Sequence, residues 1–168
     1  MIIQRYLLSF LLFLFILFLQ IYLGMVLFLA PVLNIVLIFL IFILFYFPSL
    51  YLFFLIFLSA IVFDTLSGLF WGTNLIILLV SLGSGILLTR FLEKSHFFPR
   101  LIIGESIIFI YYLCFFITNL VLKTPYISFI IFEQFIIISI FYVALSFLFD
   151  KIENVKSKSR NFKEKFKI

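Results

Sequence analysis

The sequence carries little charge for its length. Of its 168 residues, 67% are hydrophobic and 11% are charged, whereas soluble domains carry about 25% charged residues. Polar side chains are therefore too few to cover the surface of a water-soluble globule. Apolar runs longer than about 18 residues, which predict membrane-spanning helices, occur repeatedly. These features exclude a soluble domain and predict an integral membrane protein with one membrane domain.

Cysteine and histidine are also scarce, which excludes most disulfide and metal chemistry. The single cysteine, Cys114, lies inside an apolar run and has no partner for an intrachain disulfide. The single histidine, His96, lies in a polar segment beside Lys94 and Arg100. No spacing of cysteine and histidine is typical of a metal site. We therefore expect no metal and no other cofactor.

The residue patterns of known membrane enzymes are missing. The segment Leu82–Gly85, LGSG, lacks the first glycine of a serine intramembrane protease motif, and no histidine lies within a span. An aspartyl intramembrane protease needs two facing aspartates, and Asp64 is the only aspartate within a predicted span. The clustered aspartates of a phosphatidyltransferase, an H-E-x-x-H zinc site and a Gly-rich phosphate loop are absent. Without a nucleophile and an oriented base, we expect the protein not to be an enzyme.

What the sequence does contain is a series of apolar segments separated by polar residues, proline and glycine. The pattern predicts an all-α, polytopic transmembrane bundle of about six short helices within residues 1–150, followed by a basic tail over 151–168. Because several segments are short for a hydrocarbon core of about 30 Å, we expect tilted or irregular helices. The predicted spans are residues 6–28, 31–47, 50–66, 74–92, 101–122 and 127–149.

The distribution of basic residues predicts the orientation. With six spans, every Lys and Arg except Lys123 falls on the side of the two termini. Cytoplasmic loops are enriched in Lys and Arg, so both termini are expected in the cytoplasm. The tail is either a basic amphipathic helix on the anionic leaflet or a disordered, solvated segment. Nothing indicates nucleic-acid binding. The tail residues expected to meet anionic lipid are Lys156, Lys158, Arg160, Lys163, Lys165 and Lys167.

Three acidic residues lie in or at the ends of the predicted spans, where an ionisable group is costly unless it faces water, the bundle interior or a partner. Glu105 is expected one turn inside its helix, facing cytoplasmic water near Arg100 and favoured by the helix dipole. Glu133 is interpreted either as an interior polar contact or as a group that reaches the interface. Asp64 ends the third helix, where its carboxylate can accept hydrogen bonds from the following turn.

Small and amide residues predict where helices pack and turn. Gly68 and Gly72 have G-x-x-x-G spacing, but because this pair straddles a helix end, a tight turn is the better interpretation. Ser81 and Gly85 have the same small-residue spacing inside the fourth helix and predict a packing face. Pro31 is suited to the first turn of the second helix. The amides expected to form interhelical hydrogen bonds are Asn34, Asn74 and Asn119.

The segment Phe63–Gly72, FDTLSGLFWG, resembles the signature of the MreD family, the small rod shape-determining membrane proteins of bacteria. In that family an Asp at the end of the third span is followed by Ser-Gly and then by a further Gly. The corresponding positions are Asp64, Ser67, Gly68 and Gly72. The layout of the whole chain fits the family, while the motifs fall in about the first hundred residues.

Two other positions are similar to the family, and one departs from it. Gln20 lies late in the first span, and Pro31 opens the second. Family members commonly follow that proline with Asp, whereas Val32 stands here. The departure puts a family polar contact at the second helix in doubt, and Asn34 is a candidate substitute one turn further on.

The resemblance implies a non-enzymatic scaffold of the cell-wall elongation machinery in the bacterial inner membrane. It implies binding to an MreC-like bitopic protein, and indirectly to an MreB-like filament, a RodA-like glycosyltransferase and its transpeptidase partner. In size and layout the family is also similar to the substrate-binding membrane subunits of energy-coupling-factor vitamin transporters. That alternative implies a vitamin site that faces outward near Asp64.

Overall fold

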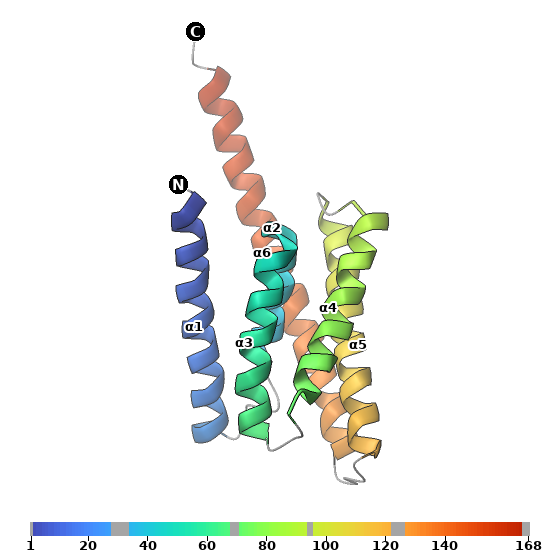
Figure 1. The fold of residues 1–168 in the computed structure, drawn as a ribbon. Coiled ribbons are helices and arrows are strands. Elements are labelled where there is room, and N and C mark those ends of the chain that lie inside the picture. The colour runs from blue at the N-terminus through green and yellow to red at the C-terminus, as the bar shows by residue number, and fades with distance from the viewer. Residues whose placement is uncertain (1, 28–33, 68–70, 94–95, 122–126, 166–168) are drawn as a thin grey trace.

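The computed structural model of the chain describes residues 2–27, 34–67, 71–93, 96–121 and 127–165, and all of its regular elements are α-helices. Pro31, Gly68 and Lys167 lie outside these ranges. The helices run up and down in sequence, and the first and last helix have their outer ends on the same side of the bundle (Figure 1). The six helices are α1 (Ile2–Leu27), α2 (Ile35–Tyr46), α3 (Ser49–Ser67), α4 (Thr73–Phe91), α5 (Phe97–Val121) and α6 (Ile127–Lys165).

Four of these helices, α1, α4, α5 and α6, are long and apolar enough to cross a membrane. The other two are apolar but shorter. At a rise of 1.5 Å per residue, α2 is only about 18 Å long, against about 30 Å of hydrocarbon. The prediction of an all-helical membrane bundle with some short helices is therefore confirmed.

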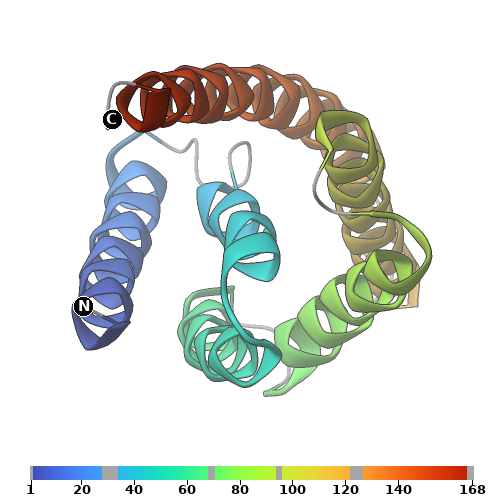
Figure 2. The ribbon, with the colours of Figure 1, turned by 90° about the horizontal axis from the view of Figure 1, so that it is seen from above.

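The short helix α2 is the centre of the bundle. Viewed from above, α3, α4, α5 and α6 form an arc around it, and α1 stands on its remaining side (Figure 2). An apolar side chain occupies almost every position of α2, as expected for a helix buried all round. Its buried residues are Val36, Leu37, Ile38, Leu40, Ile41, Ile43, Leu44 and Phe45.

The ends of α2 follow from local chemistry. Asn34 is the N-cap residue, and its side-chain oxygen accepts a hydrogen bond from the backbone N–H of Leu37 at 3.0 Å. A capping asparagine satisfies one of the free N–H groups of a first turn. At the other end, Phe47 is extended, as favoured for a residue that precedes a proline. The helix thus begins four residues after Pro31, not at it.

Helices α1, α5 and α6 extend by a turn or more beyond one end of their predicted spans, and α1 begins at Ile2. Helix α5 begins at Phe97, which places Pro99 in its first turn, where proline is tolerated. Helix α6 continues through Lys165 and has 39 residues, a length of about 58 Å. Its last part projects past the ends of the other helices (Figure 1). Of the two interpretations of the tail, the structure matches the helical one, and contact with the membrane surface stays a prediction.

Candidate functional site

The carboxylate of Asp64 organises the turn between α3 and α4. One of its oxygens accepts the backbone N–H of Gly72 at 2.7 Å. The other accepts both the backbone N–H and the side-chain amide of Asn74, at 2.9 and 3.0 Å. Asp64 is 4% exposed, yet both of its oxygens are hydrogen-bonded. These are the bonds expected of a helix-end carboxylate that accepts from the following turn.

Local backbone geometry explains the glycine at position 72. Gly72 has φ of +92° and directly precedes α4, a left-handed conformation that side-chain-bearing residues rarely adopt. Its neighbour Trp71 points outward and is 78% exposed. Thr65 does not join the turn, because its hydroxyl donates to the carbonyl of Val62 within α3. Ser67, the other motif residue in the described ranges, is the last residue of α3.

A second polar cluster ties the start of α2 to α1 and α5. The side-chain oxygen of Gln20 on α1 accepts the backbone N–H of Ile35 at 2.9 Å. The amide nitrogen of Asn34 donates to the hydroxyl of Tyr111 on α5 at 2.9 Å. Asn34 therefore makes the interhelical bond expected from the sequence, and it caps a helix as well. Asn119 donates to the carbonyl of Phe115 in its own helix.

The small residues of α4 and α5 form close helix contacts. Ser81 is fully buried, and its hydroxyl donates to carbonyls of its own helix. A Cβ at Gly85 would collide with Ile107 of α5, and one at Gly104 would collide with the ring of Tyr142 on α6. The predicted packing face at Ser81 and Gly85 therefore lies against a neighbouring helix. Gly104, which the sequence did not single out, plays the same part between α5 and α6.

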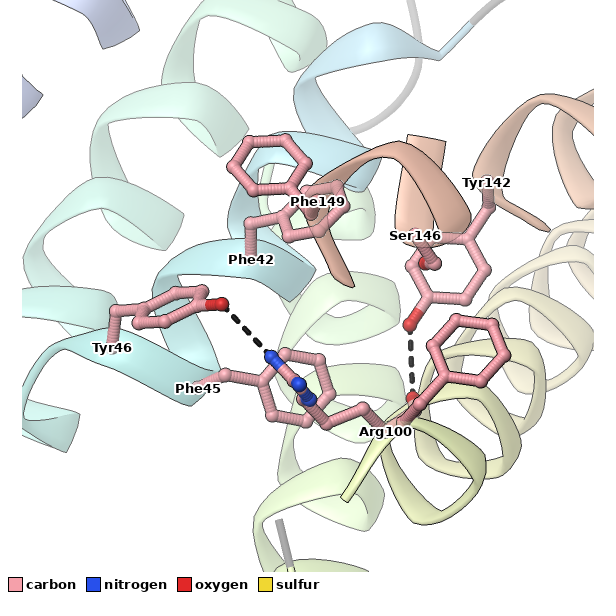
Figure 3. Close-up of a pocket in the computed structure, with 8 residues that line it drawn as sticks. Phe42, Phe45, Tyr46, Arg100, Tyr142, Ser146 and Phe149 are labelled. Atoms are coloured by element: carbon pink, nitrogen blue, oxygen red, sulfur yellow. Dashed lines mark hydrogen bonds between the residues drawn. The ribbon is translucent and has the colours of Figure 1, made fainter. Parts of the chain in front are cut away.

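Arg100 joins three helices at the end of the bundle opposite the Asp64 turn. Its guanidinium donates to the hydroxyl of Tyr46 on α2 at 2.9 Å and lies 3.6 Å from a carboxylate oxygen of Asp150 on α6. Its backbone carbonyl accepts the hydroxyl of Tyr142 on α6 at 2.9 Å. Figure 3 shows Tyr46 and Tyr142 approaching Arg100 from different helices.

The space beside Arg100 is too small for a ligand. The pocket lined by Phe42, Phe45, Tyr46 and Arg100, with four residues of α5 and α6, has a volume of about 10 Å³, the room that a single water needs. Arg100 thus acts as a crosslink between helices. The sequence pattern predicted a polar loop at Arg100, although an arginine one residue after Pro99 is compatible with the first turn of a helix.

The positions of Glu105 and Glu133 correct two interpretations. Because α5 begins at Phe97, Glu105 lies about two turns inside the helix, not in its first turn. It is partly buried, and in the described part of the chain its Oε1 atom is enclosed without a hydrogen-bond donor. Glu133 is exposed, whereas its neighbour Gln134 is 5% exposed. The interior interpretation of Glu133 is therefore wrong, and Gln134 occupies the buried polar position.

The predicted tail residues Lys156, Lys158, Arg160, Lys163 and Lys165 lie on the final part of α6, for which the structure describes the backbone helix. Within the described ranges, no group of three or more His, Cys, Asp or Glu residues could hold a metal ion. Comparison with family models, with curated proteins and with solved structures finds no match for the chain.

Proposed function

We propose that the protein is a non-enzymatic scaffold in the bacterial inner membrane, similar to MreD proteins, that serves the cell-wall elongation machinery. The observation that carries the proposal is the hydrogen bonding of Asp64, the first residue of the family-like motif. Both carboxylate oxygens accept N–H groups of Gly72 and Asn74, so the carboxylate holds a turn in place. Such a turn fixes the angle between α3 and α4, which is the kind of contribution a scaffold requires.

Lateral assembly would use the exposed surface of the bundle. Large apolar side chains point outward along α1, including Leu7, Leu8, Leu11 and Phe15. Association of helices within a membrane rests on packing and on interhelical hydrogen bonds. We propose an MreC-like bitopic protein as the direct partner, with an MreB-like filament, a RodA-like glycosyltransferase and its transpeptidase recruited through it.

The test is purification of the tagged protein from its native membranes in a mild detergent, followed by mass spectrometry. We expect a bitopic MreC-like protein to co-purify in an amount comparable to the bait. The Asp64→Ala variant, which loses the turn, is expected to recover less of this partner. Thr65→Ala is the matched control, because its hydroxyl bonds only within α3.

A vitamin-transport subunit is the alternative that the same experiment excludes or establishes. That alternative requires transport ATPases and a bound vitamin in place of the bitopic partner. It places the ligand near Asp64, where the structure uses the carboxylate for the turn. Recovery of a pair of ATPases or of a co-purified vitamin would contradict the scaffold proposal.

A further inference from the structure

A groove with a volume of about 640 Å³ lies between α1, α2 and α6. Its size is within the range of about 300–1,000 Å³ typical of small-molecule sites. The view from above shows α2 standing beside α1, with α6 passing along one side of both (Figure 2). The lining is mainly apolar, with Leu8, Leu12 and Ile16 from α1, Ile38 and Phe42 from α2, and Leu145 and Phe149 from α6.

The length of the groove matches one leaflet of a membrane. On α1 the lining runs from Arg5 to Ile16, about 16 Å at 1.5 Å per residue. On α2 it runs from Ile35 to Tyr46, a similar length. Half of a hydrocarbon core is about 15 Å. A membrane-spanning helix of a partner would need a groove about twice as long, so the dimensions favour a single lipid chain.

The groove has a cation at one end. Arg5 lines it and is exposed. It lies one turn from the start of α1, near one end of the segment Ile3–Tyr22 that is apolar enough to cross a membrane. On α6, Asp150 directly follows the lining residue Phe149 and is paired with Arg100. Among the described residues, Arg5 forms no ion pair, so its guanidinium is available to an outside anion. Guanidinium groups bind phosphate with strong, often bidentate hydrogen bonds.

We propose that this groove binds an anionic glycerophospholipid, with the phosphate at Arg5 and one acyl chain along α1 and α2. The apolar walls remove the chain from contact with bulk lipid, and the arginine selects a negatively charged headgroup. Among the described residues, the lining on α6 ends at Phe149, before the basic residues of the tail. The proposal does not depend on the proposed scaffold role. By the distribution of basic residues, the lipid belongs to the cytoplasmic leaflet.

The experiment is native mass spectrometry of the full-length protein with phosphatidylglycerol or phosphatidylcholine carrying identical acyl chains. We expect one phosphatidylglycerol to be retained roughly tenfold more than phosphatidylcholine. Both headgroups contain a phosphate, but the choline ammonium cancels its charge, so that only phosphatidylglycerol offers Arg5 a headgroup with a net negative charge. Arg5→Gln is expected to abolish this preference. Leu12→Trp is expected to reduce binding of both lipids by filling the groove, and Leu8→Trp is a second blocking variant if Leu12→Trp does not fold.

The controls are two exposed residues outside the groove lining, Arg90 at the end of α4 and Leu11 on α1. Arg90→Gln and Leu11→Trp are expected to leave the retention of both lipids unchanged. Equal retention of the two lipids by the unaltered protein would overturn the proposal. A preference for phosphatidylglycerol that survives Arg5→Gln would also overturn it, because the lipid would then bind at the basic tail. A dimer that Leu12→Trp dissociates, without lipid binding, would make the groove an interface between copies.

Discussion

A carboxylate within a bundle of apolar helices is costly unless hydrogen-bond donors surround it. Asp64 meets this condition by accepting three hydrogen bonds from two residues of the next segment. Asp64 therefore stabilises one particular turn, because all three hydrogen bonds are donated by Gly72 and Asn74. The same carboxylate would be destabilising if Gly72 and Asn74 did not present their N–H groups to it.

Asp64→Ala is expected to lower the free energy of unfolding by about 2–4 kcal/mol, because buried N–H groups lose their acceptor. The single tryptophan, Trp71, lies in this turn, so its fluorescence during thermal or SDS unfolding reports the change directly. Thr65→Ala is the control and should cost less than about 1 kcal/mol. An unchanged midpoint for Asp64→Ala would show that the turn forms without the carboxylate.

Arg100→Gln is expected to destabilise the opposite end of the bundle by about 1–3 kcal/mol, because a partly buried charge-assisted network is lost. The variant removes the ion pair with Asp150 and weakens the bond to Tyr46. The exposed Arg90 at the end of α4 is the matched control, and Arg90→Gln should change stability little. The two variants are compared by SDS titration in the same detergent. Equal stabilities would contradict the role of Arg100 as a crosslink.

At the scale of helices, close packing depends on glycines that face a neighbour. Gly104 on α5 has no room for a side chain, because the ring of Tyr142 covers it. Tyr142 is fully buried and is held by its bond to the carbonyl of Arg100, so the ring cannot easily move away. Gly83 on α4, by contrast, has no heavy atom within 4 Å of the Cβ position. The two glycines make a matched pair in helix interiors.

Gly104→Ala is expected to cost about 1–3 kcal/mol through overpacking between α5 and α6. Gly83→Ala is expected to be neutral or stabilising by up to about 1 kcal/mol, since alanine favours helix. Thermal unfolding of the two variants measures the difference. If both variants were equally stable, the contact between α5 and α6 would be looser than the structure shows.

At the scale of the whole molecule, alternating helices bring the outer ends of α1 and α6 to the same side (Figure 1). Together with the basic residues near both ends, this arrangement predicts cytoplasmic termini. An epitope at either terminus should be protected from protease in intact spheroplasts. An epitope inserted beside Lys123 should be cleaved. Termini on opposite sides would contradict a six-span topology.

Much of the fold was predictable because the information is local. Low charge and long apolar runs specify the membrane class, and Pro48 and Gly72 mark helix ends through backbone geometry that needs no tertiary context. The hydrogen bonding of Asp64 was also predictable, because its donors lie within ten residues. The position of Glu105 was predicted wrongly, because α5 begins at Phe97, one turn before the predicted start at residue 101.

The sequence by itself determined the helical membrane class, the approximate helix limits and the Asp64 turn. Only the tertiary structure decided that α2 is central, that Arg100 joins three helices, that Gln134 and not Glu133 is buried, and that a groove ends at Arg5. The physical reason is that the faces of these helices differ little in hydrophobicity. Lipid and protein interior are both apolar, so periodicity does not reveal which face points inward, and packing between distant segments makes that choice.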